Sequence, residues 1–190
     1  MTLRRGFLAE AERKAGQIRK DLDLSPASAI AIEDIARLLN VQVVPADELI
    51  DIDRLHELER IQTFAFSACT FDIADKKVIV YNPLRTRDRT QSDIAHELSH
   101  MMLDHQLSEI RVVAGVPFRS CQPDQEEEAT SLGGTLLLPR PLLLNAVRRG
   151  LNETEIAHYY GVTVEMARYR LNKTGVVRQV RSASGVRARN

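Results

Sequence analysis

The sequence is organised around one stretch, Asp93-Ile-Ala-His-Glu-Leu-Ser-His-Met-Met102. Its apolar residues recur every three or four positions, which predicts an amphipathic helix over about residues 90–107. His96 and His100 are four residues apart, so they lie one turn apart on the same helix face. The apolar stripe falls on the other side, so this face is free for chemistry rather than for core packing.

The residues His96-Glu-Leu-Ser-His100 form an HExxH pattern, which is typical of zinc proteases. Two neutral imidazoles one turn apart can bind the same Zn²⁺, and Glu97 then points beside the ion. Zinc lowers the pKa of a bound water to about 7, and a neighbouring carboxylate can take its proton during attack on a carbonyl carbon. We therefore predict His96 and His100 as metal ligands and Glu97 as general base.

A catalytic zinc site needs a third protein ligand and one open position. His105 follows His100 by five residues, which on one continuous helix turns its side chain about 140° away from the ligand face. The next predicted helix, at about residues 124–138, begins with Glu126-Glu-Glu128, although acidic residues are also favoured there by the helix dipole. Spacing alone leaves the choice among these three carboxylates open.

Together these motifs resemble the ImmA/IrrE family of zinc metallo-endopeptidases. The resemblance covers most of residues 7–172 and is carried by the hairpin end Val80-Tyr-Asn-Pro83, the HExxH segment and the segment Glu126–Pro139. It implies a gluzincin-like site with one Zn²⁺ per chain, in which Glu126 is the third ligand. Glu127 and Glu128 are the alternatives.

The chain departs from the family's pattern at three places. Ser99 stands where Gly is commonest, Thr130 where Asn or Asp is usual, and Leu132-Gly-Gly134 where Phe-Ala-Ala is typical. Thr130 lies one turn after Glu126, so its hydroxyl can orient a ligand. Two glycines within a helix cost on the order of 1 kcal/mol each relative to Ala, which indicates a close helix approach or a kink.

The surrounding chain predicts an α+β fold, with a mainly helical core and a small sheet of about three strands. We expect helices over residues 7–22 and 25–40, a strand at 41–44, and a hairpin made of 64–71 and 77–81. Thr90 begins the HExxH helix in the manner of a capping box, and a loop links that helix to the next. We divide the chain into a peptidase core at 1–145, a helix-turn-helix-like unit at 146–175 and a basic, flexible tail at 176–190.

The unit after the core has two short helical patterns joined by a tight turn at Gly161. We expect its second helix to expose Glu165, Arg168 and Tyr169, with Arg170 nearby. This surface is basic but offers few side chains for reading bases. Packing or substrate docking is the favoured role of this unit, and direct DNA binding is the alternative.

Composition narrows the class of protein. The 190 residues hold 26 basic and 26 acidic side chains, and the zero net charge alone argues against nucleic acid as a partner. Residues 148–190, however, carry nine basic and three acidic side chains. No run approaches the roughly 18 apolar residues of a membrane span, and charges after residue 9 interrupt any secretory signal, so we expect a cytoplasmic protein without a membrane partner. Cys69 and Cys121 are too few for a disulfide framework.

The family resemblance implies a protein substrate, a helix-turn-helix transcriptional repressor whose cleavage derepresses a stress, prophage or mobile-element operon. The rival hypothesis is a DNA-binding or zinc-sensing regulator with a non-catalytic HExxH site. It predicts that Arg168 and Arg170 bind duplex DNA with a steep salt dependence.

Further side chains are candidates for supporting roles. Asp93 and Asp104 lie one turn to either side of the histidines and are candidate acceptors of imidazole N–H groups. Tyr81 and His105 are candidates for stabilising the oxyanion. A peptide substrate is expected to add as a strand along the edge of the hairpin sheet.

Overall fold

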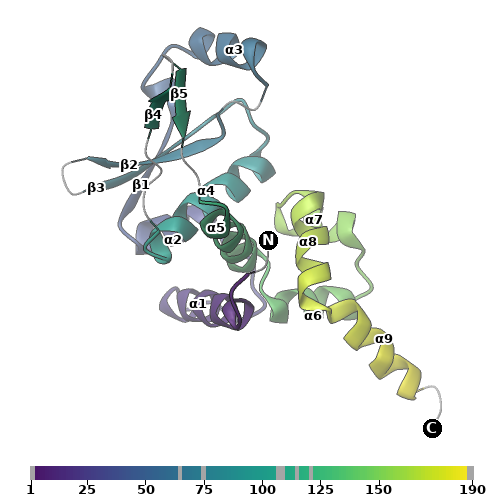
Figure 1. Cartoon of the computed structure of the whole chain (residues 1–190). Helices are drawn as coiled ribbons and strands as arrows, with labels where there is room; N and C mark the ends of the chain where they lie inside the picture. Colours follow the sequence, from purple (N-terminus) through teal and green to yellow (C-terminus); the bar gives the residue numbers. More distant parts are fainter. Residues whose placement is uncertain are drawn as a thin grey trace.

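The structure is a computed structural model, and it describes residues 3–63, 66–73, 76–105, 110–113, 116–119 and 122–187. It confirms an α+β fold that is mostly helical with a small mixed sheet (Figure 1). The elements are α1 (Phe7–Asp21), α2 (Ile32–Leu38), β1 (Val41–Pro45), the 3-10 helix η1 (Ala46–Glu48), α3 (Ile52–Ile61), β2 (Ala68–Ile73), β3 (Lys76–Tyr81), α4 (Arg87–Met102), β4 (Ile110–Val113), β5 (Val116–Arg119), α5 (Pro123–Leu137), α6 (Arg140–Arg148), α7 (Glu153–Tyr160), α8 (Val164–Thr174) and α9 (Val176–Arg187).

The three-stranded sheet has the order β1-β3-β2. β1 runs parallel to β3, and β2 pairs antiparallel with β3 in the predicted hairpin, with Cys69 opposite Val80. β2 is therefore an edge strand of this sheet. In Figure 1 the sheet lies at the upper left and helices α6 to α9 at the right, with α4 and α5 between them.

Helix α4, which carries the HExxH motif, differs from its predicted bounds at both ends. It begins one turn earlier, because the side chain of Thr86 caps it by accepting a hydrogen bond from the backbone N–H of Arg89. It ends at Met102, because Asp104 adopts a left-handed backbone conformation, with φ of 52°, that a helix cannot continue through. The predicted rotation of His105 by 140° is therefore wrong, since His105 lies beyond the helix.

The segment between α4 and α5 contains more structure than the predicted loop. β4 and β5 form an antiparallel pair in which Val112 is opposite Pro117. Proline has no backbone N–H to donate, but in a sheet of two strands each strand has one edge that makes no backbone hydrogen bonds. A proline is therefore tolerated in this pair. Cys121, also in this segment, lies outside the described residues.

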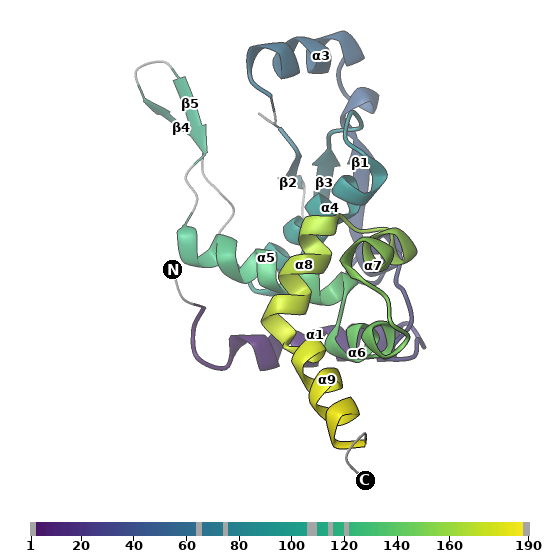
Figure 2. The same ribbon diagram turned by 90° about the vertical axis from the view of Figure 1, so that its right-hand side faces the viewer.

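The C-terminal helices pack on the core. α7 and α8 are joined at Gly161, which has a left-handed φ of 62° as the predicted tight turn requires, and Val162 after it is buried. Figure 2 shows α8 running across α5. Arg170 was expected near an exposed basic surface, and this is wrong: it is buried, donates to the carbonyl oxygen of Leu138 and pairs with Glu12 of α1 at 2.6 Å.

Residues from 176 onward were expected to form a flexible tail. The structure instead has helix α9 through Arg187, which contacts α6. The tail prediction missed Val176, a fully buried side chain that anchors the start of the helix. Within the described part of the chain, no helix combines the length and the apolar character needed to cross a membrane.

Candidate metal centre

The site depends on the packing of α4 against α5. A Cβ atom at Gly133 of α5 would lie 3.1 Å from the carbonyl carbon and oxygen of Ala95 and from the amide nitrogen of His96. The backbones of the two helices thus meet directly at the residue that begins the HExxH motif. This confirms the close helix approach that the glycine pair predicted, and it brings the start of α5 to the histidine face of α4.

Three side chains converge at this crossing. His96 Nε2 lies 3.1 Å from Glu126 Oε2 and 3.0 Å from His100 Nε2, and His100 Nε2 lies 3.5 Å from Glu126 Oε1. Ligands held at about 2.0–2.1 Å in a tetrahedron are about 3.3 Å apart, so the spacing of the three groups suits a tetrahedral ion. Nitrogen and carboxylate ligands of this kind suit zinc.

The other ring nitrogens have their own partners. His96 Nδ1 lies 3.4 Å from the hydroxyl of Thr130, as the sequence predicted for that residue. His100 Nδ1 lies 3.0 Å from His105 Nδ1, and His105 Nε2 lies 3.3 Å from a carboxylate oxygen of Glu128. These contacts hold each ring with Nε2 toward the site, which is the usual arrangement behind a metal-bound imidazole.

The structure separates the three consecutive glutamates. Only Glu126 lies between the two histidines, and hydrogen bonds from His100 and His96 hold the pKa of its carboxyl well below its usual range. Glu127 lies 3.9 Å from Lys173, and Glu128 is engaged by His105 and by Arg4, which donates to it at 2.8 Å. The helical period turns the neighbouring side chains away from the centre, so of the three glutamates Glu126 is the one beside both histidines.

Glu97 is buried, with 4% of its surface exposed. Its Oε2 accepts a hydrogen bond from the hydroxyl of Thr70 in β2 at 2.6 Å. Thr70 was missed at the sequence level, because nothing in its local pattern relates the hairpin to α4. The contact fixes the position of the glutamate from outside its own helix.

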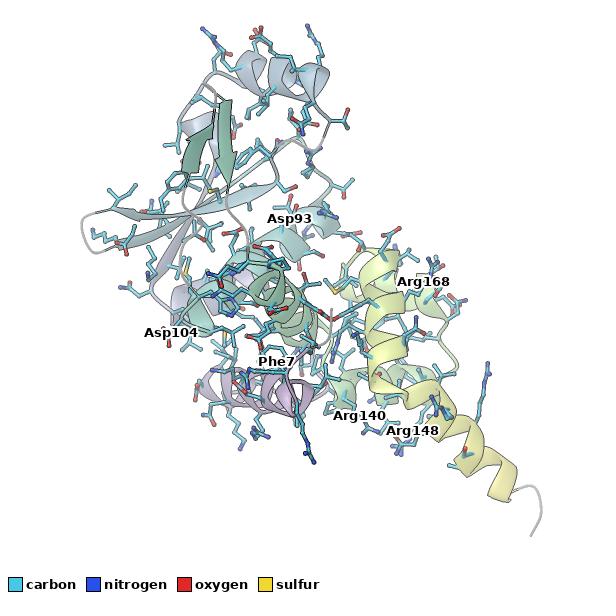
Figure 3. All side chains as sticks on the ribbon, viewed as in Figure 1. Phe7, Asp93, Asp104, Arg140, Arg148 and Arg168 are labelled. Carbon is cyan, nitrogen blue, oxygen red and sulfur yellow. The ribbon has the colours of Figure 1, made fainter. Side chains whose placement is uncertain are left out.

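Several predicted supporting residues lie elsewhere. Asp93 pairs with Arg89 at 2.9 Å, and burial raises the pKa of its carboxyl. Asp104 is exposed just past the C-terminal end of α4 (Figure 3). The position beside His100 that was expected for Asp104 is taken by His105. Tyr81 has a pKa raised by burial and by acidic neighbours, chief among them Asp47, and it does not line the cleft described next.

A cleft of about 620 Å³ lies beside the centre, with His96 and Glu97 in its wall. One side is formed by residues 66–69 at the start of edge strand β2. The opposite side is formed by α8 and the residue before it, through Thr163, Glu165, Met166 and Tyr169. The C-terminal unit therefore forms part of the candidate active site.

Comparison with known proteins identifies a related family. A family model described as the IrrE N-terminal-like domain, Peptidase_M78, matches residues 51–172, which run from the end of the loop before α3 into α8. Neither a curated protein nor a solved structure matches the chain.

Proposed function

Because the chain belongs to the Peptidase_M78 family of IrrE-like metallopeptidases, we propose that it is a zinc-dependent endopeptidase. The observation that carries this proposal is the convergence of His96, His100 and Glu126 beside a cleft that also contains Glu97. These three side chains would hold one Zn²⁺ per chain. When bound, the ion supplies Lewis acidity and lowers the pKa of a water molecule to about 7.

Glu97 is the general base and then the general acid. It takes a proton from the attacking water and delivers that proton to the amide nitrogen that leaves. The hydrogen bond from Thr70 keeps one carboxylate oxygen in place, so the carboxylate is oriented before the substrate arrives.

The substrate is an extended peptide segment. β2 pairs with β3 on one side only, and its first residues line the cleft, so a peptide can add to the free edge of β2 by backbone hydrogen bonds. Helix α8 also lines this cleft. An open strand edge in the wall of a cleft suits an extended peptide better than a compact small molecule.

We further propose that this peptide belongs to a helix-turn-helix repressor in the cytoplasm. Its cleavage would derepress a stress, prophage or mobile-element operon. The support for this step is the resemblance to the ImmA/IrrE family rather than any feature of the cleft.

The regulator hypothesis expects a DNA-binding surface at Arg168 and Arg170. Arg170 is buried against Leu138 and Glu12, and Arg168 makes three hydrogen bonds with Glu153 of the neighbouring helix. The guanidinium of Arg170 is therefore occupied inside the fold, while that of Arg168 stays on the surface, so one of the two phosphate contacts that the hypothesis requires is missing. The burial of Arg170 therefore favours the peptidase.

The test uses purified protein and a candidate helix-turn-helix repressor chosen from the genes that flank its own. Glu97→Gln should retain one equivalent of zinc and lose cleavage, because it removes the base but no ligand. Glu126→Gln should lose zinc as well as cleavage, and the adjacent Glu127→Gln should retain both. Normal cleavage by Glu97→Gln would contradict the mechanism, and full zinc binding by Glu126→Gln would contradict the ligand set.

A further inference from the structure

Tyr169 on α8 has a polar group that the folded protein does not use. The residue lines the cleft that contains His96 and Glu97. Its hydroxyl oxygen is buried, and it has no hydrogen-bond partner among the described residues. An unpaired buried hydroxyl costs about 1–3 kcal/mol, so it is usually retained for a reason other than stability.

The packing of α8 on α5 places Tyr169 in the wall of the cleft beside the metal centre. Met166 and Arg170 of α8 both approach Gly134, and Lys173 reaches Glu127 one turn further along α8. Tyr169 lies on α8 between Met166 and Lys173. It lines the same cleft as Thr130, the residue of α5 that contacts His96.

Three other side chains with donor groups that line the cleft already have partners. Arg89 binds the carboxylate of Asp93, and the hydroxyl of Ser92 donates to the backbone carbonyl of Asp88. Thr130 is engaged by His96. The hydroxyl of Tyr169 differs from these three because it is both shielded and unpaired.

We propose that Tyr169 is a catalytic residue whose hydroxyl stabilises the oxyanion formed from the scissile carbonyl; this inference rests on the proposed peptidase function. Glu97 is held on the β2 wall by Thr70, and Tyr169 belongs to the α8 wall, so a peptide between the walls has one group on each side. Water oxygen bonds to the carbonyl carbon as Glu97 takes the proton. The carbonyl oxygen gains the negative charge and accepts a hydrogen bond from Tyr169, which keeps its own proton throughout.

The test compares wild-type protein with Tyr169→Phe. We expect kcat to fall about 100- to 1000-fold with KM and zinc content unchanged, since loss of one oxyanion donor has an effect of this size. Binding of a tetrahedral phosphonamidate peptide should weaken by a similar factor, and binding of the uncleaved peptide to a Glu97→Gln background should not change. The midpoint of thermal unfolding should not decrease, because the hydroxyl has no partner to lose. Tyr159→Phe, on the exposed face of α7, is the matched control and should behave as wild type.

A wild-type kcat in Tyr169→Phe would overturn the inference, as would a loss of zinc or of thermal stability that accounts for the lost activity. Suppose that wild-type protein and Tyr169→Phe cleave the peptide at the same rate and Glu97→Gln does not cleave it. The peptidase function is then supported, and only the role of Tyr169 is wrong. If wild-type protein itself does not cleave, both proposals fall.

Discussion

Gly133 packs directly against the carbonyl group of Ala95, so that a Cβ atom at this glycine would lie 3.1 Å from both atoms of the carbonyl. The group it would meet is backbone in the middle of α4 and cannot rotate away. Glu126 lies seven residues earlier, two turns along the same face of α5. The glycine therefore controls how close Glu126 comes to the two histidines.

Gly133→Ala should push α5 away from α4. We expect a loss of about 1–3 kcal/mol in the free energy of unfolding from overpacking, together with weaker zinc binding. The control is Gly16→Ala in α1, because a Cβ atom at Gly16 would meet nothing within 4 Å. This variant should gain about 0.5–1 kcal/mol in the free energy of unfolding. Denaturant unfolding and zinc titration measure both effects, and unchanged zinc affinity in Gly133→Ala would count against this role.

His105 should set the zinc affinity although it is not a ligand. It contacts His100 Nδ1 and is held by Glu128, and burial lowers the pKa of its ring. His105→Ala should weaken zinc binding about 10- to 100-fold, measured by competition with a chelator, because the ring of His100 loses its support. Glu128→Gln should have a smaller effect in the same direction. His158 is exposed, and His158→Ala should bind zinc as wild type does. Equal zinc affinity in all three variants would contradict the role of His105 and Glu128 in supporting His100.

We expect substitution of Thr70 to lower kcat without changing zinc binding. Its hydroxyl donates to Glu97 at 2.6 Å, and hydrogen bonds to charged groups are worth about 1.5–3 kcal/mol. Thr70→Val should therefore reduce kcat about 10- to 100-fold with zinc content unchanged. Thr70→Ser, which retains the hydroxyl, should keep most of the activity. A similar loss in both variants would indicate a packing effect instead.

The pair between Glu12 and Arg170 should anchor the C-terminal wall of the cleft. The side chain of Arg170 is 2% exposed, and Glu12 also accepts from the backbone N–H of Arg140. Breaking a buried pair by removing one partner costs about 3–5 kcal/mol, so Arg170→Met should unfold at a much lower denaturant concentration. Arg168→Met, whose pair with Glu153 is exposed, should unfold as wild type. Equal stability of the two variants would contradict the anchor.

Asp93 should make the stability depend on pH. Burial raises its pKa, so the folded state binds the proton more tightly than the unfolded chain does. Its contribution to stability is therefore greatest below the unfolded pKa of about 3.9 and is lost as the pH rises through the folded value. Asp93→Asn should be more stable than wild type at pH 7, and the difference should shrink as the pH falls toward 4. Denaturant unfolding across this range is the measurement, and a destabilised variant at pH 7 would show that the pair with Arg89 outweighs burial.

The sequence alone determined the features that depend on one helical period. His96, Glu97 and His100 lie within a single turn of α4, so their relative placement follows from the geometry of any α-helix. The same holds for the tight turn at Gly161, whose left-handed backbone suits glycine. The fold class was also predictable, since the alternation of helical and strand patterns is local.

Tertiary structure alone decided the contacts between elements. It brought Glu126, rather than Glu127 or Glu128, between the two histidines and Thr70 to Glu97. It also buried Arg170 near a surface that was expected to be exposed and basic. Spacing along the chain cannot supply these, because the distance between side chains on different elements is set by how closely backbones pack. Here that distance is set by the missing side chain of Gly133 against Ala95.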